Sequence, residues 1–79
     1  MGNVRYLIYG RSSCEYCVEA CDLLQASGEE FIFFDENILY LEYVKSFYGK
    51  KTVPIILQNH LQTGEVKMVG GCSDLKELF

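Results

Sequence analysis

The sequence predicts a single α/β domain whose sheet contains both parallel and antiparallel strands. Apolar runs of strand length alternate with segments of helical periodicity, in the order β-α-β-α-β-β-α. A helical segment separates the first two strand runs, which predicts a parallel pair joined by a right-handed crossover. A short polar turn separates the last two, which predicts an antiparallel hairpin. With 79 residues, the chain is expected to form one domain over residues 1–79.

The N-terminal half is predicted to contain two strands joined by a helix. The run VRYLIY at Val4–Tyr9 is apolar, β-branched and aromatic, as expected of a buried strand, and Gly10–Ser13 is expected to form a loop. From residue 14 to residue 27, apolar and small residues recur at three- and four-residue spacing, which is typical of a helix. Gly28 is placed to end that helix. The run FIFF at Phe31–Phe34 predicts a second buried strand.

A second helix and a third strand follow. Asn37 is a suitable N-terminal cap for the helix, and Gly49 is placed to end it. One side of this helix is expected to be apolar and to carry Ile38, Leu41, Val44 and Tyr48. The run VPIIL at Val53–Leu57 predicts the strand. Pro54 has no N–H for a ladder hydrogen bond, so it indicates a strand start or an edge position.

The C-terminal segment is predicted to be a hairpin followed by a short helix. Asn59–Glu65 contains a glycine and is predicted to form the hairpin turn, which would include His60. Val66–Val69 is the returning strand. The sequence GGCSDLKELF then predicts a turn and a final helix, with Ser73 or Asp74 as its cap.

Composition and charge exclude several classes of function. Apolar residues make up 49% of the chain and aromatic residues 14%, which favours a compact fold over disorder. The net charge of -4 argues against nonspecific binding to nucleic acid, which requires a basic surface. No apolar run approaches the length needed to span a membrane, and the N-terminal residues lack the pattern of a signal peptide. We therefore expect a cytoplasmic protein that binds neither nucleic acid nor membranes.

The stretch GRSSCEYC places two cysteines, Cys14 and Cys17, where a strand and loop give way to a helix. The unpaired N–H groups and the dipole of a helix N-terminus favour an anion, and Arg11 adds a positive charge nearby. Both effects stabilise a thiolate, which is the reactive form of cysteine. Three residues is a same-face spacing on a helix, so the second sulfur can reach the first. The pattern predicts a redox centre in which Cys14 is the nucleophile and Cys17 the resolving thiol.

Two other interpretations of the cysteine pair are weaker. A zinc site needs two further ligands, and the only soft candidates are Cys21, Cys72 and His60, which lie in no second ligand motif. A structural disulfide is disfavoured in a reducing compartment. We therefore expect no metal.

Three motifs give the chain a resemblance to the glutaredoxins. They are GRSSCEYCVEACDLL, KKTVP and VGGCSDL, in this order, and the similarity extends over nearly the whole chain. The family pattern consists of Cys-Pro-Tyr-Cys, Thr-Val-Pro and Gly-Gly-x-x-Asp, so Glu15 is a departure because it replaces the proline. The resemblance implies the thioredoxin fold, a four-stranded mixed sheet flanked by three helices. It also implies glutathione as the reducing co-substrate, with Cys14 attacking and Cys17 resolving.

The resemblance further implies a groove that binds glutathione. Tyr16 would line the groove beside the segment Thr52, Val53 and Pro54. Val53 would offer its backbone N–H and C=O to the cysteine of glutathione, as in strand addition. Pro54 would have a cis peptide bond that turns this backbone toward the nucleophile. Gly71 would allow the backbone to approach the ligand closely.

Charged and polar groups would hold the two ends of glutathione. Arg11 and Lys51 are suited to its glycine carboxylate. The backbone N–H groups of Cys72 and Ser73 suit its γ-glutamyl carboxylate. Asp74 suits the ammonium group.

Three of these residues also have a simpler interpretation. Asp74 can cap the last helix, in a capping box with Glu77. Arg11 can be a solvated loop charge. Cys72 can be a small core residue that contributes only its backbone.

The predicted function is that of a monomeric, glutathione-dependent thiol–disulfide oxidoreductase. Its substrates would be protein disulfides and mixed disulfides with glutathione. Family analogy suggests ribonucleotide reductase as one protein partner.

Two alternative functions remain open. One is an iron–sulfur cluster carrier, in which two protomers and two glutathiones hold the cluster, although the bulky Glu15 disfavours it. The other is a redoxin reduced by thioredoxin reductase, although the GGCSDL segment favours glutathione.

Overall fold

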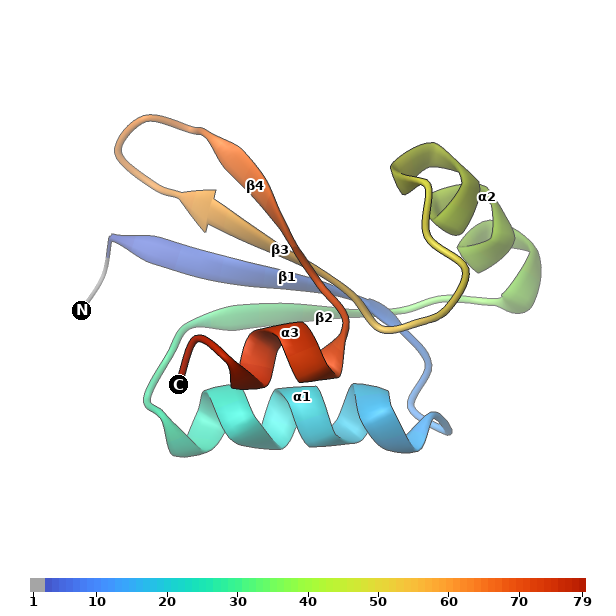
Figure 1. Cartoon of the computed structure of the whole chain (residues 1–79), viewed down its shortest axis with the longest axis horizontal. Helices are drawn as coiled ribbons and strands as arrows, with labels where there is room; N and C mark the ends of the chain where they lie inside the picture. Colours follow the sequence, from blue (N-terminus) through green and yellow to red (C-terminus); the bar gives the residue numbers. More distant parts are fainter. Residues whose placement is uncertain (1–2) are drawn as a thin grey trace.

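The computed structural model describes residues 3–79 and has an α/β fold with one mixed sheet (Figure 1). Its elements follow the predicted order β-α-β-α-β-β-α. They are β1 (Val4–Gly10), α1 (Glu15–Ala26), β2 (Phe31–Asp35), α2 (Ile38–Tyr48), β3 (Ile55–His60), β4 (Val66–Gly70) and α3 (Cys72–Lys76). Met1 and Gly2, which the single-domain prediction includes, lie outside the described residues. No described helix has the length and apolar character needed to cross a membrane.

The strands lie in the order β2-β1-β3-β4. β1 is parallel to β2 and antiparallel to β3, and β3 is antiparallel to β4, which confirms the predicted crossover and hairpin. In this register Ile8 pairs with Phe33 on one side and with Ile56 on the other. Because side chains alternate between the two faces of a strand, these three residues point to the same face. This face carries the main core.

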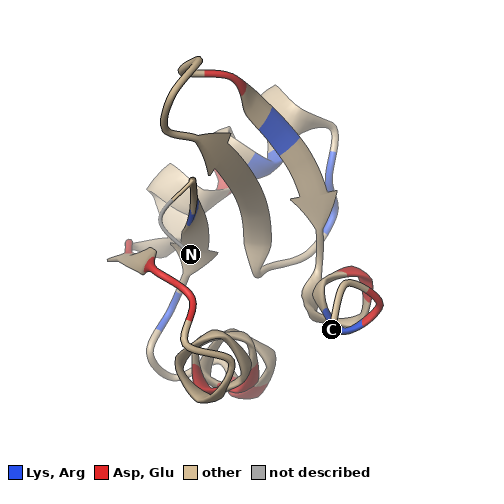
Figure 2. Cartoon of the chain, turned by 90° about the vertical axis from the view of Figure 1, so that its left-hand side faces the viewer, with Lys and Arg blue, Asp and Glu red and all other residues tan. Residues whose placement is uncertain are grey.

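The helices form two layers around the sheet, with α1 and α3 on one face and α2 on the other (Figure 1). The largest group of core residues joins the sheet to α1 and α3 and consists of Tyr6, Ile8, Ala20, Leu24, Ile56, Cys72 and Leu75. Leu24 and Leu75 are fully buried, and each contributes about 1.5–3 kcal/mol by leaving water. Acidic residues lie on both helices (Figure 2), and Glu19 of α1 forms an ion pair with Lys76 of α3. These contacts hold α3 beside α1.

The ends of the long helices confirm the predictions. α1 ends before Gly28, and α2 ends at Gly49. The side chain of Asn37 accepts a hydrogen bond from the backbone N–H of Tyr40 at 2.8 Å, as expected of an N-cap. On the predicted apolar side of α2, Leu41 and Val44 are buried and Tyr48 is half-buried. Ile38, at the start of the helix, is 59% exposed.

Four other predictions require correction. β2 is an edge strand in which no residue is fully buried, because it has a neighbour on one side only. Gly10 belongs to β1, where it pairs with Asp35. The third strand begins at Ile55 and not at Val53; Pro54 lies directly before it and marks the strand start, which is one of the two positions predicted. His60 belongs to β3 and not to the turn, because it pairs with Val4 and its ring hydrogen-bonds to Gln58 at 3.1 Å.

Candidate active site

The loop after β1 brings Cys14 to the N-cap position of α1. The residue has an extended conformation, with φ -88° and ψ 120°, and its carbonyl accepts the hydrogen bond from the Val18 N–H at 3.1 Å. Its own N–H donates to the Arg11 carbonyl at 3.0 Å, which closes the loop tightly. No side-chain oxygen caps the helix, so the N–H groups of its first turn have no side-chain acceptor. The positive end of the α1 dipole and these N–H groups therefore lie at Cys14.

Cys17 is fully buried one turn into the helix, and it is a neutral thiol at physiological pH. Burial away from water, followed by a hydrogen bond with Cys14, raises the pKa of Cys17 from 9.0 to about 12. Cys14, in contrast, is half-exposed. The arrangement agrees with the predicted roles, because the accessible sulfur lies at the helix end and the second sulfur lies behind it.

The raised pKa of Cys17 predicts a pH dependence of stability. Between pH 9.0 and about 12, the unfolded chain loses the Cys17 proton while the folded chain keeps it. The contribution of this thiol is therefore fully present below pH 9.0 and is lost as the pH rises toward 12. Urea unfolding under reducing conditions should show a steeper fall in the free energy of unfolding between about pH 9 and pH 10.5 for wild type than for Cys17→Ala. Parallel curves for the two proteins would contradict the assignment.

The remaining two thiols are also held neutral. Burial, together with the nearby Asp22 charge, raises the pKa of Cys21. Burial, together with the nearby Glu19 charge, raises the pKa of Cys72. All four cysteines are free thiols, so the structure represents the reduced state. Among residues 3–79, no group of three or more histidine, cysteine or acidic side chains is arranged to hold a metal ion.

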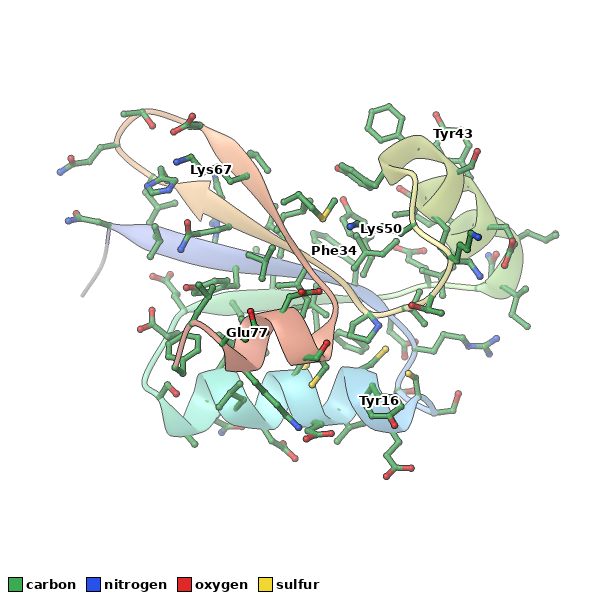
Figure 3. All side chains as sticks on the ribbon, viewed as in Figure 1. Tyr16, Phe34, Tyr43, Lys50, Lys67 and Glu77 are labelled. Carbon is green, nitrogen blue, oxygen red and sulfur yellow. The ribbon has the colours of Figure 1, made fainter. Side chains whose placement is uncertain are left out.

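An open groove of about 430 Å³ lies at the start of α1, where Tyr16 of the Cys-x-x-Cys motif lines it. Seven residues predicted from the resemblance line it: Tyr16, Thr52, Val53, Pro54, Gly71, Cys72 and Ser73. Tyr16, between the two cysteines, is 61% exposed at the start of α1 (Figure 3). The tertiary structure thus brings three segments that are distant in sequence to one surface, as predicted.

The peptide bond between Val53 and Pro54 is cis, which confirms that prediction. Pro54 is buried, whereas Val53 is half-buried and lies before the first pair of the ladder, Tyr9 with Ile55. The backbone of Val53 is therefore at the groove and outside the hydrogen bonding of the sheet.

The predicted cap of the last helix is wrong. Gly71 is the N-cap of α3, and Glu77 is at the opposite end of the helix as its C-cap, so the box of Asp74 with Glu77 does not form. Instead, Asp74 is the third residue of the helix, and its Oδ2 accepts a hydrogen bond from the Gly71 N–H at 2.9 Å. This bond is half of a capping box, because Gly71 has no side chain to return it.

The requirement for glycine in this turn is stronger at Gly70 than at Gly71. Gly70 has φ +122°, and a Cβ there would lie 2.3 Å from the Asp74 Oδ2. A Cβ at Gly71 would meet the protein only at 3.9 Å, which is an ordinary contact. The predicted close approach of a ligand to Gly71 stays a prediction.

Five predicted site residues do not line this groove: the two cysteines of the motif, Cys14 and Cys17, and the charged residues Arg11, Lys51 and Asp74. Asp74 lines a second surface hollow together with residues of β3 and β4.

The sequence analysis missed one residue near the cysteines, Gly10. An ideal Cβ at this residue would lie 2.4 Å from the Cys17 Sγ, so the end of β1 packs directly against the Cys17 thiol. The available signal was a glycine between an apolar strand run and the Cys-x-x-Cys motif.

Comparison with known proteins agrees with this geometry. The family model for glutaredoxin matches residues 6–60. A search of the curated proteins found no match. The solution structure of a glutaredoxin from Brucella melitensis is 33% identical with a TM-score of 0.71, over 99% of this chain and 80% of that chain.

Two further structures share the fold. A wheat glutaredoxin has a TM-score of 0.73 at 24% identity, over 92% of this chain and 67% of that chain. Glutaredoxin 1 from Francisella tularensis, in complex with cacodylate, has a TM-score of 0.63 at 22% identity, over 94% and 90% of the two chains. The sheet and its three helices are those of the thioredoxin fold. The chain belongs to the glutaredoxin family.

Proposed function

We propose that this protein is a thiol–disulfide oxidoreductase that uses glutathione to reduce protein disulfides and mixed disulfides with glutathione. The observation that carries the proposal is the groove formed by Tyr16, Thr52–Pro54 and Gly71–Ser73 next to an accessible cysteine at a helix N-terminus. Its open shape suits an extended tripeptide, and the Val53 backbone is available for strand-like pairing with it. The backbone N–H groups of Cys72 and Ser73 suit the γ-glutamyl carboxylate.

The proposed reaction balances through two exchanges. The Cys14 thiolate attacks one sulfur of the substrate disulfide, forms a mixed disulfide and releases the other sulfur as a thiolate. For a protein disulfide, Cys17 then attacks Cys14: a Cys14–Cys17 bond forms, the bond to the substrate breaks, and the substrate sulfur leaves with the proton lost by Cys17. Two glutathione molecules reduce the new disulfide and leave as glutathione disulfide. For a glutathionylated substrate, glutathione itself resolves the mixed disulfide at Cys14.

A coupled assay with two reductants tests the proposal. A glutathionylated peptide is the substrate, and electrons come either from glutathione with glutathione reductase or from thioredoxin reductase. We expect turnover with the first system and little with the second. The reverse result would support the thioredoxin reductase alternative.

Anaerobic purification followed by a visible absorption spectrum tests the cluster alternative, because a bound iron–sulfur cluster is coloured.

The role of Asp74 is testable because its two proposed contacts respond differently to substitution. Asp74→Asn keeps an oxygen that can accept from the Gly71 N–H but removes the charge that would bind the glutathione ammonium. We expect it to raise the Michaelis constant for glutathione about two- to fivefold, the range for an exposed ionic contact, with little change in melting temperature. Asp74→Ala should raise the constant as much and also lower the melting temperature.

An unchanged Michaelis constant in Asp74→Asn would mean that Asp74 serves only the turn. Arg11→Ala provides the parallel test at the glycine end of glutathione, and Lys51→Ala tests the second residue proposed to bind the glycine carboxylate.

The physiological protein partner, including ribonucleotide reductase, and the cytoplasmic location remain predictions from the resemblance and the sequence.

A further inference from the structure

The sulfur of Cys17 lies against the backbone at the end of β1. A Cβ added to Gly10 would lie 2.4 Å from the Cys17 Sγ and 3.2 Å from the Cys17 Cβ. Both contacts are closer than packed atoms normally allow. The thiol therefore occupies the space that a side chain at residue 10 would fill.

The contact with Cys17 alone accounts for glycine at this position. The glycines with positive φ are Gly28, Gly49, Gly64 and Gly70, so Gly10 has no backbone conformation that excludes other residues. It pairs with Asp35 in the regular β1–β2 ladder. Phe33 lies 3.5 Å from the same Cβ position, which leaves the space closed on that side. A methyl group here can be accommodated only if the Cys17 side chain rotates or the first turn of α1 moves.

We propose that Gly10 is a positioning residue for the resolving step: its lack of a side chain keeps the Cys17 thiol beside Cys14. This inference rests on the proposed role of Cys17. During resolution the Cys17 sulfur attacks the Cys14 sulfur, the Cys14–Cys17 bond forms, and the bond from Cys14 to the substrate breaks. Cys17 is fully buried, and its sulfur lies where a Cβ of residue 10 would be. Either rearrangement forced by a larger residue 10 therefore moves the sulfur from the place that it holds against Gly10, three residues along the chain from Cys14.

Kinetics of disulfide closure provide the first test. Cys14 is converted to a mixed disulfide with an aromatic thiol whose thiolate absorbs visible light, and closure by Cys17 releases that thiolate. In Gly10→Ala we expect closure to slow at least about tenfold, because the reacting sulfurs lose their alignment. Turnover of a glutathionylated peptide, which needs only Cys14, should stay within about threefold of wild type. Equal losses in the two measurements, or unchanged closure, would overturn the proposal.

A matched control separates this effect from damage to the strand. Tyr9 precedes Gly10, and its side chain lies on the opposite face of β1, among residues of α2. Tyr9→Leu therefore perturbs the same strand end without touching Cys17, and we expect its closure rate to match that of wild type. A loss of closure in Tyr9→Leu as large as in Gly10→Ala would also overturn the positioning role.

A double-mutant cycle tests the contact itself. In the wild-type background, Gly10→Ala should increase the unfolding equilibrium constant at least about fivefold. In the Cys17→Ala background, Gly10→Ala should change that constant much less, because the sulfur that the new methyl group would contact is absent. Equal effects in the two backgrounds would refute the contact. Closure and unfolding require no glutathione, so they decide the role of Gly10 even if the coupled assay refutes the proposed function.

Discussion

Cys14→Ser is expected to abolish every thiol-exchange activity of this protein, with a loss of more than about a thousandfold. Cys14 is the one cysteine at the N-cap of α1, where no side chain occupies the N–H groups of the first turn. Burial raises the pKa of each of the other three thiols, so none of them supplies a thiolate at neutral pH. A serine hydroxyl at residue 14 cannot form or exchange a disulfide. The measurement is turnover of both a glutathionylated peptide and a protein disulfide.

Cys21→Ala is the matched control for this variant. Cys21 is half-buried on α1, one turn beyond Cys17, and it does not line the groove. We expect it to retain activity on both substrates. Cysteine alkylation followed by mass spectrometry gives an independent measurement: in the native protein at neutral pH, Cys14 should be labelled first. Residual turnover in Cys14→Ser, or preferential labelling of another cysteine, would contradict the assignment of Cys14 as nucleophile.

Cys17→Ser is expected to separate the two proposed activities. Reduction of a protein disulfide should fall more than about a hundredfold, because the variant replaces an attack by a neighbouring thiol with a bimolecular attack by glutathione. Turnover of a glutathionylated peptide should persist, since glutathione resolves that mixed disulfide itself. The measurement compares the two substrates at one glutathione concentration.

The control for Cys17→Ser is a measurement of folding. Cys17 is fully buried, so a serine hydroxyl there is placed in an apolar environment and lowers stability. Unfolding curves for Cys17→Ser and Cys17→Ala establish the temperature range in which both variants are folded, and both should show the same separation of activities. Equal losses on the two substrates in folded protein would show that Cys17 does not act as the resolving thiol.

Local sequence signals were sufficient wherever one short segment determines the outcome. The order of elements, the cap at Asn37, the helix end at Gly49 and the placement of Cys14 at the start of a helix were all predicted correctly. Each depends on backbone preferences or side-chain periodicity within a few residues. The seven residues that line the groove were also predicted, but from the resemblance to a family and not from the residues themselves.

The predictions that failed concern each element's neighbours. An apolar run such as Phe31–Phe34 is compatible with an internal or an edge strand, and the position of β2 depends on which strands pair with β1. The exposure of Ile38 likewise depends on how much of the sheet α2 covers. The N-cap of α3 is Gly71 and not the predicted Ser73 or Asp74, because the Asp74 carboxylate turns back and accepts a hydrogen bond from the Gly71 N–H.

The sequence by itself determined the arrangement on which the proposed chemistry depends: two cysteines three residues apart, with the first at the start of a helix. Only the tertiary structure decided how the two thiols differ. Folding buries Cys17 completely against Gly10, whereas it leaves Cys14 half-exposed at the end of the helix. The physical reason is that burial and close contact arise from segments that meet only in the folded chain, here β1 and α1. The motif predicts which cysteine attacks, but the access of each cysteine to water cannot be obtained from its position in the motif alone.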